Sequence, residues 1–128
     1  MNVKNISKSV FMLFRYATMT KRIHYSTKKN SMHKLCDDAF EKINDFADNL
    51  AETGYGLYGK PTIQDMTINV QVDERDTLPS ICKDCLDICT LLRSEMDNLK
   101  DKQNQGIVSL IDDFMSDMLQ IIYLSTFE

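Results

Sequence analysis

The chain has 128 residues, of which 43% are hydrophobic and 27% are charged, so it is long enough for one domain with an apolar core. Four glycines and two prolines favour long helices over many turns. No apolar run reaches the length of about twenty residues that spans a bilayer, because Arg15, Lys21 and Arg22 interrupt the most apolar segment. We therefore expect a soluble protein without a membrane partner.

Charge is distributed unevenly along the chain, whose net charge is −4. Up to Cys36 there are eight Lys or Arg residues and no acidic residue, whereas the remainder has seven basic against nineteen acidic residues. Three interpretations of the basic part remain open. It resembles a transit peptide, although removing one here would remove the first histidine. It is a solvated basic face, or it binds DNA phosphates. The residues that could contact DNA are Lys4, Lys8, Arg15, Lys28 and Lys29.

The first predicted helix runs from Asn5 to about Lys28. Its apolar residues recur at intervals of three and four, and the series ends at His24. A single histidine at such a position is more often a hydrogen-bonded core residue than a metal ligand. The turn that follows provides Asn30 or Ser31 as the N-cap of the next helix, and its shortness predicts an antiparallel helical hairpin.

The second predicted helix runs from about Ser31 to Thr53, where Gly54 suits a helix C-terminus. One face is apolar and is expected to face the core, with Met32, Cys36, Ala39, Ile43, Phe46 and Leu50. Within an arc of about 100°, the opposite face carries a histidine and four acidic residues. They are His33, Asp37, Glu41, Asp48 and Glu52. Such a face is normally exposed to solvent, and we interpret Asp38 and Asp45 in the same way. Alternatively, a second subunit covers this face.

Residues 62–76 are ambiguous between a helical turn and a short strand, so we interpret them as a long crossover with at most a short helix. A third helix is expected from Thr77, with Pro79 in its first turn, to about Lys102, and a fourth from about Asn104 to Ser125. The pattern Cys82-x-x-Cys85-x-x-x-Cys89, with Cys36, suggests a redox or zinc site. Because it lies within a helix, without a second pair or a nearby histidine, we favour buried free thiols in a reducing cytoplasm.

Both histidines of the chain and a regular series of carboxylates lie between residues 20 and 52. The pattern is Lys-x-x-His-aromatic, a second histidine, an aspartate one turn later, and a closing Asp-x-x-Ala-Glu. It is formed by Lys21, His24, Tyr25, His33, Asp37, Asp48, Ala51 and Glu52. Over these residues the chain resembles the Dps family of mini-ferritins, the small ferritin-like iron oxidases. The interval between His24 and His33 is shorter than in usual members, and Ser26–Ser31 lacks their glycine-containing loop.

The resemblance implies both a fold and an activity. Residues 1–128 would form a single ferritin-like (Dps-like) domain, an all-α four-helix bundle with a long crossover between its second and third helices. In the family, the histidines of one subunit and the carboxylates of its two-fold mate bind two irons. The implied catalytic and metal-binding residues are His24, His33, Asp37, Asp48 and Glu52, of which Asp37 is the weaker candidate. Two-fold dimers would assemble into a hollow homo-oligomer, a dodecamer, that oxidises Fe(II), stores ferric iron and protects DNA from oxidative damage.

Two further observations bear on this hypothesis. The last two predicted helices contain no histidine, so they cannot provide the Glu-x-x-His pairs of an ordinary di-iron bundle. Imidazole combined with several carboxylates is a ligand set that suits iron. Two alternatives remain: a ferritin-like assembly protein whose shortened loop has abolished catalysis, and a protein that coats DNA through its basic N-terminal region.

Overall fold

In the computed structural model, the described residues are 3–61, 69–70, 75–99 and 102–128. Within these ranges the chain is all-helical and no strand occurs, which confirms the predicted class. The elements are α1 (Val3–Ser26), α2 (Asn30–Tyr58), α3 (Leu78–Asn98), the short 3₁₀ helix η1 (Lys102–Asn104) and α4 (Gln105–Ser125). Most of the crossover expected to carry a short helix or strand, residues 62–68 and 71–74, lies outside the described residues.

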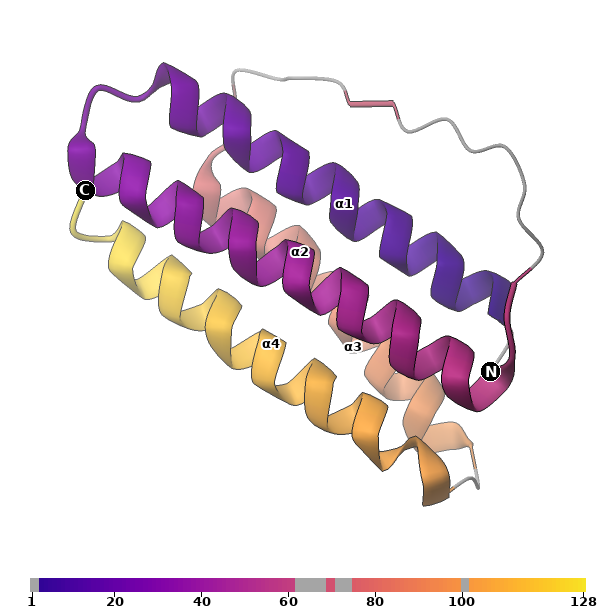
Figure 1. The fold of residues 1–128 in the computed structure, drawn as a ribbon. Coiled ribbons are helices and arrows are strands. Elements are labelled where there is room, and N and C mark those ends of the chain that lie inside the picture. Colours follow the sequence, from indigo (N-terminus) through magenta and orange to yellow (C-terminus); the bar gives the residue numbers. More distant parts are fainter. Residues whose placement is uncertain (1–2, 62–68, 71–74, 100–101) are drawn as a thin grey trace.

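The four α-helices pack side by side (Figure 1). The contacts join α1 to α2, α2 to α4, α4 to α3, and α3 to α1. A link of three residues connects α1 to α2, and Figure 1 shows the two helices running antiparallel, as predicted for this hairpin. The end of α4 lies beside the start of α2, where the Ser31 hydroxyl donates a hydrogen bond to Glu128 Oε2 at 2.6 Å. No helix in the described part of the chain is long and apolar enough to cross a bilayer.

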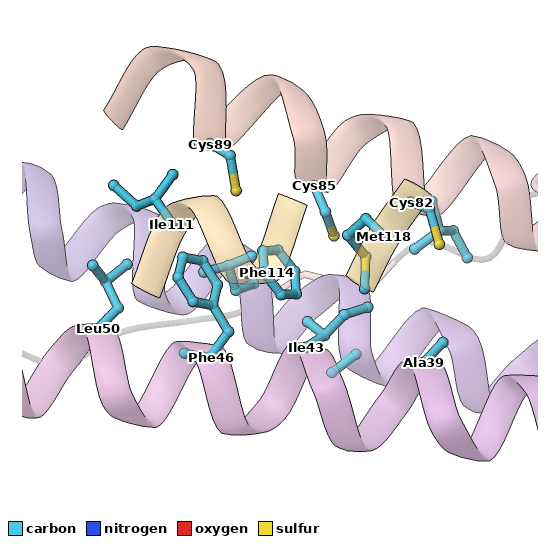
Figure 2. Close-up of a cluster of buried hydrophobic side chains, with 14 of the residues drawn as sticks. Ala39, Ile43, Phe46, Leu50, Cys82, Cys85, Cys89, Ile111, Phe114 and Met118 are labelled. Atoms are coloured by element: carbon cyan, nitrogen blue, oxygen red, sulfur yellow. The ribbon is translucent and has the colours of Figure 1, made fainter. Parts of the chain in front are cut away.

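All four α-helices contribute to one apolar core, and the apolar faces predicted from periodicity form it. Figure 2 shows Phe46 of α2 against Phe114 of α4, whose rings stack with centroids 4.1 Å apart. The side chains of Cys82, Cys85 and Cys89 point from α3 into this core. All four cysteines of the chain are buried, which confirms the prediction that they pack in the core.

Burial changes the acid–base chemistry of these thiols. It raises the pKa of Cys36 to about 11 and the pKa of Cys82 and Cys89 to about 12, because a thiolate loses its hydration in an apolar environment. The pKa of Cys85 is raised well above its ordinary value for the same reason. Since the thiolate is the reactive form, burial and a raised pKa both lower the reactivity of the four thiols in the folded chain.

The N-cap residue and the C-terminal end predicted for α2 were wrong. The helix begins at Asn30, and its N-cap is Lys29, which makes no side-chain capping bond, rather than Asn30 or Ser31. It also continues through Gly54 to Tyr58 and ends at Gly59, which has a positive φ of 101°. Gly54 is buried inside the helix, and a Cβ atom there would lie 2.9 Å from Ile6 Cδ1 of α1. The glycine therefore permits close packing of α1 on α2 and does not end the helix.

The start of α3 agrees with the sequence prediction. Thr77 is the N-cap, and its hydroxyl oxygen accepts a hydrogen bond from the Ser80 amide at 3.3 Å, while Ser80 Oγ accepts one from the Thr77 amide at 2.9 Å. The helix ends at Asn98 rather than near residue 102. Beyond it, the buried Asn104 side chain donates to the Met96 carbonyl at 3.0 Å and ties the start of α4 to α3. Hydrogen bonds thus cap the start of α3 and join its end to the start of α4.

Candidate metal centre

The two histidines lie against each other at the α1–α2 turn. His24 is in the last turn of α1 and His33 is in the first turn of α2. Their ring centroids are 4.5 Å apart and the ring planes are inclined at 85°. Because the link between the helices has only three residues, the antiparallel hairpin brings these residues together despite their separation in sequence.

A charged pair lies beside the histidines. Asp37 Oδ1 is 3.2 Å from His24 Nδ1 and 3.3 Å from the Lys21 ammonium. That ammonium also lies 4.5 Å from the centroid of the Phe40 ring, a cation–π contact. The Asp37 side chain is 55% exposed, so the ion pair contributes little to stability. Asp37 thus contacts both Lys21 and His24 at this turn.

These contacts decide which nitrogen of His24 is free. His24 Nδ1 faces two acceptors, the Asp37 carboxylate and the His33 backbone carbonyl, which is 3.1 Å away. A ring nitrogen between two acceptors carries the proton, so the neutral imidazole has its lone pair on Nε2. Metal-binding histidines are usually oriented in this way, with one nitrogen donating to a carbonyl or carboxylate. The geometry therefore leaves Nε2 of His24 available to a metal ion.

The remaining predicted ligands lie elsewhere on the same chain. Asp48 and Glu52 are exposed on the outer face of α2, as predicted. Counted from Asp37 at 1.5 Å per residue, they lie about 16 and 22 Å further along the helix. Nowhere in the described ranges could a group of three or more His, Cys, Asp or Glu side chains hold a metal ion. A single chain thus places His33 and Asp37 beside His24 without forming a three-residue metal site, and it leaves the two distal carboxylates far away.

The basic residues that could contact DNA are spread along α1 and the following turn. Lys8, Lys28 and Lys29 are exposed, and about 30 Å of helix separates the first from the other two. Arg15 is half-buried, and its Nε has no hydrogen-bond partner in the described part of the chain. The side chain of Lys4 lies outside the described part. The described basic side chains therefore form a row and not a compact patch.

One surface feature was not singled out from the sequence. Leu119, Tyr123 and Phe127 lie on the outer side of α4 and its C-terminal turn, exposed by 55%, 63% and 70%. Their spacing of four residues places them on one helix face, opposite the core-facing Phe114. The spacing is present in the sequence, but apolar residues also occupy most of the neighbouring positions, so periodicity alone does not identify this exposed face.

Comparison with known proteins gives one family. Its model, described as a family of unknown function (DUF5856), matches residues 24–124. No curated protein and no solved structure matches the chain. The matched region contains both histidines, Asp37, Asp48 and Glu52, and it extends well beyond half of the sequence. The chain therefore belongs to the DUF5856 family.

Proposed function

We propose that this protein is a mini-ferritin of the Dps type, which oxidises Fe(II) at a di-iron site between two subunits and stores the ferric product in a hollow homo-oligomer. The proposal includes a ferritin-like arrangement of the four helices with a long crossover from α2 to α3. It also includes two-fold dimers that assemble into a dodecamer in the cytoplasm, where removal of Fe(II) protects DNA from oxidative damage. Iron is the substrate and the stored cargo.

The observation that carries this proposal is the symmetry of the candidate ligands along α2. His33 and Glu52 are equally distant from the point between residues 42 and 43, and so are Asp37 and Asp48. An antiparallel two-fold pairing of α2 about this point would place His33 opposite Glu52 of the partner subunit. The same register would place Asp37 opposite Asp48 of the partner subunit. One contact would therefore complete two equivalent sites.

Two outward-facing residues close to the two-fold axis are compatible with this pairing. Glu41 and Asn44 are also equally distant from the midpoint, and both lie toward the outer side of α2. The Glu41 carboxylate would face the amide of Asn44 of the partner subunit, an acceptor opposite a donor. The pairing thus avoids opposing carboxylates at its centre, where they would repel most strongly.

The ligand chemistry supports iron as the metal. Two imidazoles and several carboxylates bind Fe(II) and also stabilise the harder Fe(III) product. Asp48 and Glu52, one helical turn apart, would bind from one subunit, while His24 and His33 would bind from the other. Two ferrous ions together supply the two electrons that, with two protons, reduce one molecule of peroxide to water or one molecule of oxygen to peroxide. The contacts of His24 Nδ1 would leave Nε2 as the nitrogen that binds the metal ion.

The first test is the aerobic Fe(II) oxidation progress curve of the wild type and an Asp48→Ala, Glu52→Ala variant. A matched control is Asp113→Ala, Asp117→Ala, which removes two carboxylates at the same spacing from α4. We expect rapid oxidation by the wild type and the control, and the buffer rate from the site variant. Equal rates in all three proteins would refute the proposed activity.

Complementation tests whether the site lies between subunits. Chains with His24→Ala, His33→Ala would be co-expressed with chains carrying Asp48→Ala, Glu52→Ala. Random pairing would leave about a quarter of the sites intact, because half of the dimers are mixed and each of these retains one complete site. Recovery of activity in the mixture, with none in either variant alone, is the expected result. A site within one subunit would show no recovery.

The same proteins separate the two alternatives. A ferritin-like assembly protein without catalysis would form the same oligomer in the wild type and the Asp48→Ala, Glu52→Ala variant, with no oxidation above the buffer rate in either. A DNA-coating protein would shift DNA mobility in a strongly salt-dependent way, and Lys28→Gln, Lys29→Gln would weaken that shift. Neither result depends on the histidines.

A further inference from the structure

The solvent-facing side of α4 is polar in the first half of the helix and apolar in the second half. In the first half, the middle of this face is formed by Gln105, Ser109, Asp112 and Ser116, all exposed. In the second half, the same face carries the row Leu119, Tyr123 and Phe127, more than half exposed at each position. At about 100° per residue, the three side chains of this apolar row fall within an arc of about 80°. An exposed row of large apolar side chains of this kind marks an interaction surface.

The apolar row is fixed in place by the chain around it. The amides of Thr126, Phe127 and Glu128 donate to carbonyls three residues earlier, at 3.0 to 3.2 Å, so the helical path continues past the end of α4. The Tyr123 and Phe127 rings meet edge to face with centroids 5.2 Å apart. The Ser31–Glu128 hydrogen bond ties this end to the start of α2. The row therefore presents a defined shape to a partner.

The charges around the apolar row indicate what kind of partner fits. From Met118 to Phe127 there is no charged residue, although the chain as a whole has a net charge of −4. Asp112, Asp113 and Asp117 all precede this segment on α4, and Glu128 follows it. Along a segment without charged side chains, a second copy of this acidic chain meets no like-charge repulsion. The segment from Met118 to Phe127 meets that condition.

We propose that the apolar row is a self-association surface, where α4 packs antiparallel against α4 of a second copy about a two-fold axis at Tyr123. Leu119 and Phe127 each lie four residues from Tyr123, so Leu119 would contact Phe127 of the partner subunit on both sides of the axis. The two Tyr123 rings would face each other, extending the edge-to-face pairs. This surface is on a different helix from the candidate metal centre and does not depend on the proposed function.

The size of the apolar row predicts the strength of the contact. With aromatic side chains of 150–250 Å², the exposed parts of the row and the adjacent Leu124 provide roughly 400 Å² per copy. This is about half of what each partner buries in a standard interface. The contact alone is therefore a weak, concentration-dependent dimer. In an oligomer with a second interface, it would be strengthened because the copies are already held close together.

Sedimentation velocity of the full chain over about a hundredfold range of concentration tests this proposal. Two variants are compared with the wild type: the single variant Phe127→Ser, and a triple variant that combines Leu119→Ser, Tyr123→Ser and Phe127→Ser. The matched control is Leu91→Ser on α3. Leu91 is 69% exposed and Phe127 is 70% exposed, so the two single substitutions remove similarly accessible apolar side chains. We expect association in the wild type and the control, weaker association with Phe127→Ser, and loss of one association step in the triple variant.

Three outcomes would overturn the inference: a wild type that stays monomeric, a triple variant that sediments like the wild type, or equal losses in Leu91→Ser and Phe127→Ser. A cross-linking measurement fixes the geometry. Under mild oxidation, Tyr123→Cys should form a covalent dimer much faster than Ser109→Cys, and equal rates would refute the antiparallel register. The natural cysteines do not interfere because all four are buried.

The result can be separated from the proposed iron oxidation. The Asp48→Ala, Glu52→Ala variant should associate through α4 like the wild type. Iron oxidation lost with α4 association unchanged supports both proposals. Association that is insensitive to the α4 substitutions, alongside normal oxidation, overturns only the α4 inference.

Discussion

Two glycines in the last part of α2 provide a matched test of how α1 and α2 pack. Gly54 is buried, and a Cβ atom there would lie 2.9 Å from Ile6 Cδ1 and 3.1 Å from Ile6 Cγ2. Ile6 is fully buried and cannot rotate into solvent. Gly56 lies in the same helix but is exposed, and a Cβ atom there would meet no neighbouring side chain within 4 Å. Alanine substitution therefore adds the same methyl group to a filled site and to an open one.

The expected free energies follow from this difference. Replacing a helical glycine by alanine stabilises a helix by about 1 kcal/mol. At Gly54, overpacking against Ile6 opposes this gain and costs about 1–3 kcal/mol. We expect Gly56→Ala to raise the free energy of unfolding by up to about 1 kcal/mol, and Gly54→Ala to lower it by up to about 2 kcal/mol.

Urea unfolding followed by far-ultraviolet circular dichroism would measure both variants, with the midpoint as the readout at constant slope. The variant Ile6→Val, which lacks the Cδ1 atom, should reduce the cost of Gly54→Ala and leave the effect of Gly56→Ala unchanged. Equal stabilisation by Gly54→Ala and Gly56→Ala would refute the packing argument. So would a Gly54→Ala cost that does not change with Ile6→Val.

Three further predictions concern the core and a helix cap. Alkaline pH should destabilise the fold, because the pKa of Cys82 and Cys89 is about 12 when folded and returns to about 9 on unfolding. Above about pH 9 the unfolded state binds fewer protons than the folded state, so the free energy of unfolding should fall by up to about 1.4 kcal/mol per pH unit for each thiol. Urea unfolding under reducing conditions would measure this decrease. The variant Cys89→Ala should make the free energy of unfolding depend less steeply on pH. Thr77→Ala removes the α3 cap and should cost about 1 kcal/mol in urea unfolding, whereas Thr90→Ala, at an exposed mid-helix site, should not destabilise. Phe114→Ala removes a stacked core ring and should cost about 3–5 kcal/mol, seen as a large drop in Tm; a small drop would contradict the packing described.

The helices and their inner faces were predictable because the signal is local. On α2, apolar residues such as Ile43, Phe46 and Leu50 recur with the period of a helix, and all three are buried. The cap at Thr77 was predictable for the same reason, since its partner lies three residues away. The C-terminal end of α2 was not predictable from local sequence. Whether Gly54 ends a helix or sits inside one depends on Ile6, 48 positions earlier, which sequence neighbours cannot indicate.

For the candidate metal centre, the sequence identified both histidines, and the short link between α1 and α2 predicted an antiparallel hairpin. Tertiary structure decided how His24 is oriented, through a carbonyl on α2 and a carboxylate one turn beyond it. The positions of Asp48 and Glu52 show what the structure of one chain cannot decide. Their distance along a rigid helix prevents them from meeting His24 within one chain, so only the arrangement of a second subunit can complete the proposed site.

The C-terminal half of α4 shows most clearly what the sequence determined and what it did not. Its apolar, charge-free composition from Met118 to Phe127 is evident from the sequence, and it favours a helix with a buried face. Because apolar residues occur at nearly every position, periodicity does not separate Ile121, which is buried, from Tyr123, which is exposed. Only packing against α2 and α3 assigns each side chain to the core or to solvent, since those neighbours cover one side of α4 and leave the other uncovered.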